Sequence, residues 1–324
     1  MNNLTTTTTD AALVTTDDLR LDRNPAAVYI ASLTSELSRA TMRGALDTVA
    51  RMVGGDQADA LSFPWQAMRY EHTAAIRARL AERYAPASAN KMLAALRGAM
   101  RAAWRLGLMT AEDYHRAADV TAVKGDRLPA GRSITTGELA ALMDVCAADL
   151  TAAGARDAAI LALMYTTGCR RAEVCAADLA DYDPAAGLVV RGKGRKERLV
   201  HVVNGAADAM ADWLAIRGDR PGALFLPVRK GGHVVRVARL STTAINMLLQ
   251  RRAKAAGVKA ISCHDFRRSF IGDHLDAGTD LALVARMAGH ASVTTTASYD
   301  RRPEAAKRAA AEALHIPYRR RVIG

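Results

Sequence analysis

The stretch His264-Asp265-Phe266-Arg267, followed by Gly289-His290 and Ser298-Tyr299, decides how this chain is interpreted. His264 and Arg267 lie three residues apart, so a helix presents both side chains on one face. Taken singly, each motif is unspecific, because such a His-x-x-Arg pair, a lone histidine and a single tyrosine most often serve packing or ion pairing. We expect Gly289 to end a helix and Tyr299 to lie where a new helix begins.

Two further motifs lie upstream. Arg170 follows Thr167-Gly168-Cys169, where a glycine interrupts an apolar helix and would aim the arginine from the start of the next one. Lys193 lies in a Gly-Lys-Gly turn between two expected strands, although such a turn is more often an ordinary loop. Guanidinium forks can hold two phosphate oxygens at once. The candidate catalytic residues are Arg170, Lys193, His264, Arg267, His290 and Tyr299.

In this order and context the motifs resemble those of the tyrosine recombinase (phage integrase) family. Residues 165–181 resemble its first box, with Arg170 at the position of the catalytic arginine and Glu173 at the acidic position three residues later. Residues 190–202 resemble its β-hairpin, and residues 264–299 resemble its second box. The helical block before residue 121 is similar in pattern only.

This resemblance implies a mechanism. Tyr299 would attack a scissile DNA phosphate and form a 3′-phosphotyrosyl link, which frees a 5′-hydroxyl. Arg170 and Arg267 would hold the non-bridging oxygens, and His264 and His290 would add hydrogen bonds. Attack by the 5′-hydroxyl of a partner strand would then complete strand exchange.

The same resemblance assigns the proton transfers. His264 would accept the proton of the tyrosine hydroxyl, and Lys193 would protonate the departing oxygen, because an ammonium beside two guanidiniums gives up its proton more readily. Five side-chain donors balance the charge that a metal ion carries in other phosphoryl-transfer sites. We therefore expect no metal, no ATP and no other cofactor, since the phosphotyrosine conserves the energy of the phosphodiester.

The family acts on double-stranded DNA with specific recombination sites and assembles as a tetramer on paired sites. We accordingly expect a homo-tetramer. A helix expected over residues 303–314 carries a stripe of alanines that is suited to close docking on a neighbouring protomer. Packing of that helix on its own domain explains the stripe equally well.

Three other functions fit parts of the pattern. A type IB topoisomerase uses similar chemistry on one duplex, and the helical amino-terminal block favours a recombinase over it. A DNA-binding protein without catalysis would not need the complete catalytic set. A metal-dependent phosphohydrolase built on His264-Asp265 lacks further His and Asp ligands in comparable motifs.

The composition fits a globular, basic protein. Half of the 324 residues are apolar and 24% are charged, which is not typical of disordered chains. The 45 Lys and Arg residues exceed the 33 Asp and Glu residues and give a net charge of +12, which attracts polyanions such as duplex DNA. A basic surface that merely aids solubility would give the same count. The length favours two domains.

Helical periodicity predominates, and residues 188–190 and 199–203 read as strands. The expected fold is mainly α with a small antiparallel β-sheet (α+β), in which an N-terminal helical core-binding domain and a C-terminal catalytic domain clamp DNA. The expected parts are a disordered segment (1–23), the core-binding domain (24–120), a linker (121–132), the catalytic domain (133–302) and a C-terminal tail (303–324).

Capping residues predict several helix ends. Asn24-Pro25 is expected to start the first helix, Ser88 to cap a later one, and Thr135 with Glu138 to form a capping box. Further helices are expected over residues 158–165, 206–216, 243–255, 264–277 and 281–288.

Basic residues of the first half are candidates for DNA contact. Arg97, Arg101 and Arg105 recur at helical spacing and form one stripe. Lys124 and Arg127 lie in the linker, which we expect to be extended along a phosphate backbone. A solvated helix face explains the arginine stripe about as well as DNA binding does.

We expect a cytoplasmic, nucleoid-associated prokaryotic protein. No apolar run approaches the roughly 18 residues needed to span a bilayer. The threonine-rich start lacks the basic and apolar regions of a signal peptide. We expect no separate arm-binding domain before Asn24, because about two dozen polar residues are too few for one. The four cysteines contain no Cys-x-x-Cys pair, as expected in a reducing compartment.

Two residues depart from the family pattern. Cys169 stands where leucine is usual, and Arg268 stands where histidine is common. Neither change removes a catalytic group. Our hypothesis from the sequence is that Cys169, beside the site, makes activity sensitive to thiol reagents.

Overall fold

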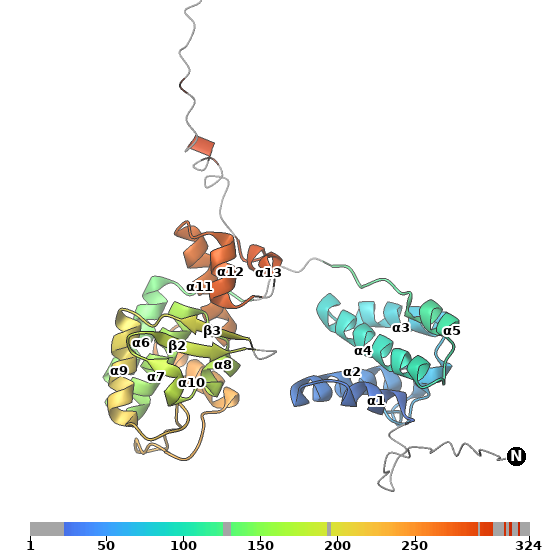
Figure 1. The fold of residues 1–324 in the computed structure, drawn as a ribbon, viewed down its shortest axis with the longest axis horizontal. Helices are drawn as coiled ribbons and strands as arrows, with labels where there is room; N and C mark the ends of the chain where they lie inside the picture. Colours follow the sequence, from blue (N-terminus) through green and yellow to red (C-terminus); the bar gives the residue numbers. More distant parts are fainter. Residues whose placement is uncertain are drawn as a thin grey trace, which may run out of the picture. The chain divides into compact units, whose positions relative to one another are not determined.

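The computed structural model describes residues 23–125, 131–192, 196–290, 292–300, 308, 311–312 and 317. The chain forms two compact units, Met1–Leu128 and Pro129–Gly324. Among the described residues, the first unit contains helices and the second combines helices with a small antiparallel sheet (Figure 1). The expected class, mainly α with a small antiparallel sheet, is confirmed.

The first unit is built around one long amphipathic helix, α4 (Pro86–Arg105). Leu93, Leu96 and Met100 are fully buried on one face of α4, and the other helices of the unit pack around it. These elements are α1 (Pro25–Ala31), α2 (Glu36–Gly54), the 3₁₀ turn η1 (Trp65–Ala67), α3 (Tyr70–Arg83) and α5 (Ala111–Ala118).

Capping predicted two helix starts correctly and one wrongly. The Asn24 side chain accepts a hydrogen bond from the backbone N–H of Ala27, and Thr135 and Glu138 form the expected capping box of α6. Ser88, however, lies inside α4. The helix begins at Pro86, because proline is favoured at the first helical position, where its missing N–H costs no hydrogen bond.

A helix that is buried on nearly all sides forms the core of the second unit. Ile160, Leu161 and Leu163 of α7 are fully buried although they point in different directions around the helix axis. The helix expected over residues 158–165 is therefore only the most apolar part of α7. The elements of this packing are α7 (Ala152–Thr167) with α6 (Thr136–Ala148), α9 (Gly205–Arg217) and α11 (Cys263–Asp276) around it.

The small sheet has the strand order β1-β2-β3 and is antiparallel throughout. β2 (Gly187–Arg191) confirms the first predicted strand. β3 (Glu197–Val200) overlaps the second, predicted over residues 199–203, only at Leu199 and Val200, because its pairing with β2 begins at Glu197 and ends at Val200. Their register places Val190 opposite Arg198. β1 (Tyr182–Asp183) was not predicted, because two residues are too few to show an alternating pattern.

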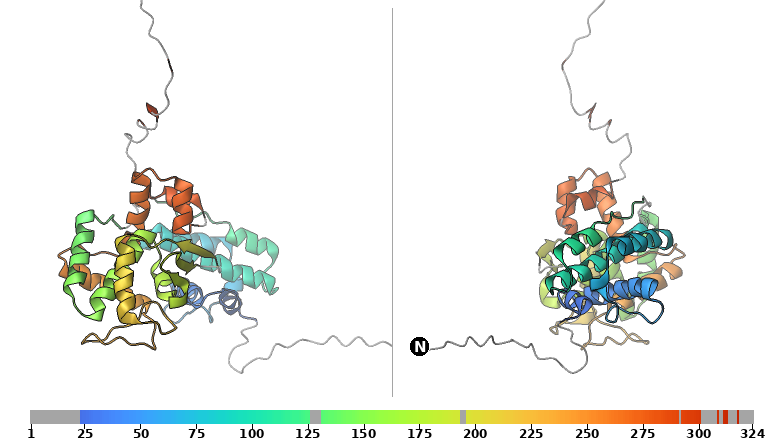
Figure 2. Two further views of the ribbon diagram at one scale, coloured as in Figure 1. Left: turned by 60° about the vertical axis from the view of Figure 1, so that its left-hand side comes forward. Right: turned by 90° about the vertical axis from the view of Figure 1, so that its right-hand side faces the viewer.

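Helices α11, α12 (Leu281–Ala288) and α13 (Val293–Ala297) gather at one end of the second unit in every ribbon view (Figures 1 and 2). A small apolar cluster between α11 and α12 is packed against Tyr299. Gly289 ends α12 in the left-handed conformation, as expected. Tyr299 follows α13 and does not begin a helix, because Ser292 already caps α13 upstream.

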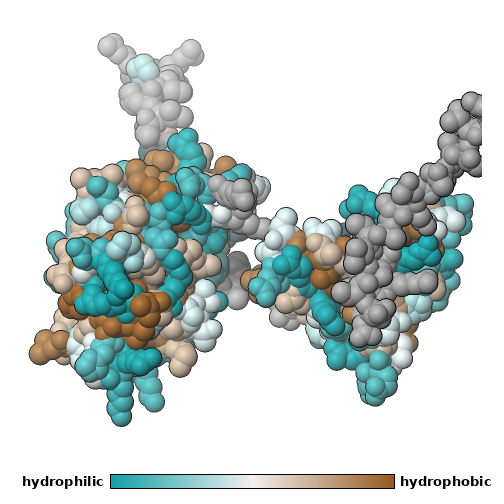
Figure 3. Space-filling view, turned by 60° about the horizontal axis from the view of Figure 1, so that its bottom comes forward, coloured by the Kyte–Doolittle hydropathy of each residue, from teal (hydrophilic) through white to brown (hydrophobic). Residues whose placement is uncertain are grey.

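The remaining elements of the second unit are α8 (Arg171–Ala176), the 3₁₀ turn η2 (Leu179–Asp181) and α10 (Thr242–Ala255). The helix predicted over residues 303–314 lies almost wholly outside the described residues. In Figure 3, hydrophilic side chains cover much of each unit, with smaller apolar areas between them. None of the helices in the described ranges is both long and apolar enough to cross a bilayer.

Gly168 is a position where the fold requires glycine. Its φ is +60°, and a Cβ there would lie 2.4 Å from Cδ1 of Phe270. Gly257 has a similar φ of +65° but open space around it. We expect Gly257→Ala to lower the free energy of unfolding of the second unit by about 1 kcal/mol through backbone strain alone. Gly168→Ala should cost roughly 1–3 kcal/mol more through overpacking.

Native-state hydrogen exchange of the amides of α7 measures this free energy for each variant. Equal losses in the two variants would show that Phe270 does not restrict the position.

Candidate active site

Arg170 is positioned by the junction between α7 and α8. Gly168 ends α7 in the left-handed conformation, and Arg170 serves as the N-cap residue of α8. The carboxylate of Glu173 accepts hydrogen bonds from the Arg170 backbone N–H and from Nη1, each at 2.8 Å. Nη2 of Arg170 donates to the carbonyl of Gly289 at 3.1 Å. The guanidinium is thus held through both terminal nitrogens, and the residue remains exposed.

Arg267 lies on α11 and is only 4% exposed. Its Nη1 donates to the carbonyl of Gly168 at 2.7 Å, so the two arginines are tied to the same chain junction. Its Nη2 is buried and has no hydrogen-bond partner among the described residues. A buried cationic donor without a partner is costly, and an anionic ligand would satisfy it.

His264 and Tyr299 form a direct pair. Nε2 of His264 lies 3.1 Å from the hydroxyl of Tyr299. Burial, followed by the charges of Arg268 and Arg267, lowers the pKa of His264 below its ordinary value. The imidazole is therefore neutral at pH 7 and able to accept a proton from the phenol.

His290 lies beside this pair. Its ring centroid is 6.1 Å from that of Tyr299, and its Nδ1 lies 2.7 Å from the hydroxyl of buried Thr296. Burial and the charges of Arg267 and Arg170 lower the pKa of His290 to about 4. When the Thr296 hydroxyl donates to Nδ1, Nε2 carries the proton and becomes a hydrogen-bond donor.

Some of these side chains line a cationic pocket of about 310 Å³, whereas Tyr299 and His290 are not among its lining residues. It brings together three of the predicted residues, Arg170, His264 and Arg267, and adds Arg171 and Asn246, which the sequence did not single out. Lys193 lies outside the described residues. The pocket is lined by Arg170, Arg171, Asn246, Ser262, Cys263, His264 and Arg267.

Arg198 is the main site residue that the sequence interpretation missed. From β3, its Nη1 and Nη2 donate to the Glu173 carboxylate at 3.1 and 2.9 Å, and its Nε donates to the carbonyl of Met287 at 3.1 Å. Arg198 lies two residues before the buried residue Val200, so both side chains are on the same, inward face of β3. This spacing could have revealed the arginine.

Arg268 and Cys169 also adjoin the site. The guanidinium carbon of Arg268 lies 5.1 Å from the centroid of the Tyr299 ring. Cys169 is 1% exposed, and burial raises the pKa of its thiol. Burial and the raised pKa both oppose reaction with thiol reagents, which argues against the hypothesis that Cys169 makes activity thiol-sensitive.

The basic residues of the first unit differ in their surroundings. Arg97 is half-buried and donates to the backbone carbonyls of Ala118 and Val120. Nε of Arg101 donates to the hydroxyl of Tyr114 at 2.9 Å. Arg105 and Lys124 are exposed. Arg127 lies outside the described residues.

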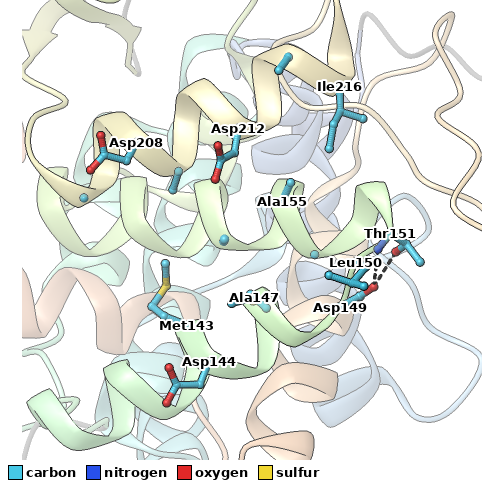
Figure 4. Close-up of a pocket in the computed structure, with 16 residues that line it drawn as sticks. Met143, Asp144, Ala147, Asp149, Leu150, Thr151, Ala155, Asp208, Asp212 and Ile216 are labelled. Carbon is cyan, nitrogen blue, oxygen red and sulfur yellow. Dashed lines mark hydrogen bonds between the residues drawn. The ribbon is translucent and has the colours of Figure 1, made fainter.

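A second hollow in the second unit has the opposite character. This groove of about 570 Å³ lies along α6, α7 and α9. Asp144 projects from α6, and Asp208 and Asp212 project from α9 (Figure 4). Carboxylates repel a phosphate backbone, so the cationic pocket is the better phosphate site of the two. In the described part of the chain, no three His, Cys, Asp or Glu side chains are grouped to hold a metal ion.

The lowered pKa of His290 makes stability depend on pH. The unfolded chain binds this proton below about pH 6.5, whereas the folded protein binds it near pH 4. Above pH 6.5 the titration of His290 therefore costs no stability. As the pH falls from 6.5 towards 4, the unfolded chain takes up the proton first, and the free energy of unfolding declines. We expect His290→Gln to make the decline shallower in urea denaturation at several pH values. Equal declines in both proteins would contradict the assignment.

Comparison with known proteins agrees with this geometry. The sequence pattern of the Phage integrase family matches residues 132–305. Tyrosine recombinase XerC of Corynebacterium efficiens is 40% identical over 162 residues, which are 48% of this chain and 50% of that protein. Tyrosine recombinase XerD of Mycobacterium tuberculosis is 36% identical over 224 residues, which are 65% of this chain and 68% of that protein. The chain thus spans about half the length of the Corynebacterium relative.

Two solved structures share the fold. A lambda integrase dimer bound to a COC′ core site has a TM-score of 0.64 at 16% identity and covers 85% of this chain and 95% of that chain. The XerH site-specific recombinase bound to a palindromic difH substrate has a TM-score of 0.60 at 19% identity and covers 85% of this chain and 77% of that chain. Since the family pattern spans more than half of the sequence, this chain belongs to the phage integrase family.

Proposed function

We propose that this chain is a site-specific DNA recombinase that cleaves and rejoins DNA through a 3′-phosphotyrosyl intermediate. One observation carries the proposal. A phenol lies in hydrogen-bond contact with a neutral histidine, beside a buried guanidinium that has an unused donor. This arrangement supplies a nucleophile, a base and an anion-binding group at one place.

In the cleavage step, the Tyr299 oxygen attacks the scissile phosphorus and its proton passes to Nε2 of His264. Negative charge develops on the non-bridging oxygens. Nη2 of Arg267, the guanidinium of Arg170 and Nε2–H of His290 would stabilise that charge. Burial lowers the pKa of Arg267 to about 10, so this group is still cationic at neutral pH.

The bond between phosphorus and the 5′-oxygen breaks as the tyrosyl ester forms. The departing oxygen takes a proton from Lys193, whose position in the hairpin is known from sequence only. Attack by a 5′-hydroxyl on the phosphotyrosine reverses both proton transfers. One phosphodiester is exchanged for another, so the cycle uses neither ATP nor a redox partner.

The wider assembly is part of the same proposal. Residues 24–120 would form a core-binding domain that clamps duplex DNA together with the catalytic domain, residues 133–302. The basic residues assigned to DNA contact are Arg97, Arg101, Arg105, Lys124 and Arg127. A related fold has been solved as a lambda integrase tetramer bound to a Holliday junction. We propose a homo-tetramer on paired sites, associated with the nucleoid in the bacterial cytoplasm.

Replacement of the nucleophile tests the chemistry. Tyr299→Phe keeps the ring that packs on the α11–α12 cluster but removes the attacking oxygen. We expect the rate of covalent complex formation on nicked suicide substrates to fall by more than about 10⁴-fold. The matched control, Tyr70→Phe, alters an exposed tyrosine of the first unit and should leave the rate unchanged.

Sequencing the DNA trapped by the unaltered protein would identify the target sites. A covalent complex that persists in Tyr299→Phe, or one that chelators abolish, would contradict the mechanism.

Strand exchange separates a recombinase from an enzyme that relaxes one duplex. We expect the full chain to join two marked duplexes that carry the trapped site. Deletion of residues 304–324 should abolish this exchange and leave cleavage intact, because the tail would serve contacts between protomers. Plasmid relaxation without exchange by the full chain would favour the topoisomerase-like alternative. Equal exchange with and without the tail would place the tail in its own protomer.

A further inference from the structure

The site contains one carboxylate that two guanidiniums share. The Glu173 side chain is 5% exposed and accepts hydrogen bonds from both Arg170 and Arg198. Burial alone would raise the pKa of Glu173, but hydrogen bonds from Arg198 and from the backbone of Arg170 hold it below its ordinary value. Glu173 is therefore charged at neutral pH. Two cations and one anion leave a single positive charge.

The two arginines of this trio differ in access. The Arg170 side chain is 45% exposed and lines the cationic pocket, where the scissile phosphate would bind; it is called the phosphate pocket below. The Arg198 side chain is 15% exposed and does not line the pocket. Its donors are directed to Glu173, to the carbonyl of Met287 and, at 3.8 Å, to Sγ of Cys169. The surplus charge of the trio is thus presented to the pocket by Arg170.

We propose that Arg198 is a positioning residue of strand cleavage, which neutralises Glu173 so that the charge of Arg170 is available to the scissile phosphate. This inference rests on the proposed function. It assigns Arg198 no contact with DNA. It also explains why a carboxylate, which by itself opposes phosphate binding, lies so close to the phosphate pocket.

The physical argument concerns charge at short range in a partly buried place. Without Arg198, the buried carboxylate would pair with Arg170 alone, and the pair would be neutral. Charges that are removed from water interact strongly, so this loss is not screened as it would be on the surface. Glu173 would keep its two bonds to Arg170, so the guanidinium would stay in place but attract phosphate less.

Three variants isolate the charge effect. Arg198→Met removes the counter-charge, and we expect single-turnover cleavage of a nicked suicide substrate to slow by about 10–100-fold, the scale of one lost oxyanion donor or less. Arg198→Lys keeps the charge, so its cleavage rate should be closer to that of the unaltered protein than the rate of Arg198→Met is. In Arg198→Met with Glu173→Gln the carboxylate is also gone, and cleavage should recover by about 10-fold relative to Arg198→Met.

The same hairpin offers a matched control. Arg191 lies on β2, its side chain is 54% exposed, and it pairs with Asp181 and Glu197, away from the phosphate pocket. Arg191→Met removes an arginine and its ion pairs by the same change. The change leaves the buried carboxylate of Asp181 without this partner, so it also controls for the loss of an ion pair. Its cleavage rate should stay within about threefold of the unaltered protein, because neither Arg191 nor Asp181 lines the pocket.

A readout that does not need cleavage separates the two proposals. Inorganic phosphate should raise the thermal stability of the unaltered protein. The rise should be smaller for Arg198→Met, and for the double variant it should be larger than for Arg198→Met. If no variant or parent cleaves DNA but this order of phosphate binding holds, the proposed function fails while the charge relation stands.

The relation between Arg198 and Glu173 is overturned if the double variant cleaves as slowly as Arg198→Met or more slowly. That result would show that Arg198 only supports the local fold. It is equally overturned if Arg191→Met slows cleavage as much as Arg198→Met does, or if phosphate stabilises Arg198→Met as strongly as the parent.

Discussion

The site depends on the ion pairs that the buried carboxylate of Glu173 forms with Arg170 and Arg198. This carboxylate accepts hydrogen bonds from the start of α8, through Arg170, and from β3, through Arg198. Arg198 also reaches the end of α12 at Met287, and Arg170 reaches Gly289. One charge therefore joins three segments that are far apart in the sequence. Removing a partner from such a group is costly, because the remaining charge cannot recover its hydration.

Burial and the charges of the arginines together set the protonation of the two histidines. His264 and His290 are both held neutral, through burial first and then through neighbouring guanidiniums. A neutral imidazole can accept a proton from Tyr299 or donate one hydrogen bond from a defined nitrogen. The same arginines that would attract a phosphate therefore add to the effect of burial in keeping both histidines neutral.

Local sequence signals predicted most of the fold, and they failed where the signal was short or ambiguous. The capping box at Thr135 and the proline after Asn24 are local features, so they hold whatever the rest of the chain does. The preference of proline for the first helical position also explains the error at Ser88, because Pro86 offered an earlier helix start. β1 has two residues and exists only because β2 lies beside it. Its pairing is a tertiary event with no periodic pattern of its own.

The sequence by itself predicted which residues carry the chemistry, because the order Arg, Lys, His-x-x-Arg, Gly-His and Tyr matches the family motifs even without coordinates. Only the tertiary structure decided how they work together. It placed the Tyr299 hydroxyl at Nε2 of His264 and brought Thr296 to His290. It also turned an arginine of β3 towards a carboxylate 25 residues away in sequence. Charge pairing, burial and hydrogen bonding act through space, and chain order does not encode those distances.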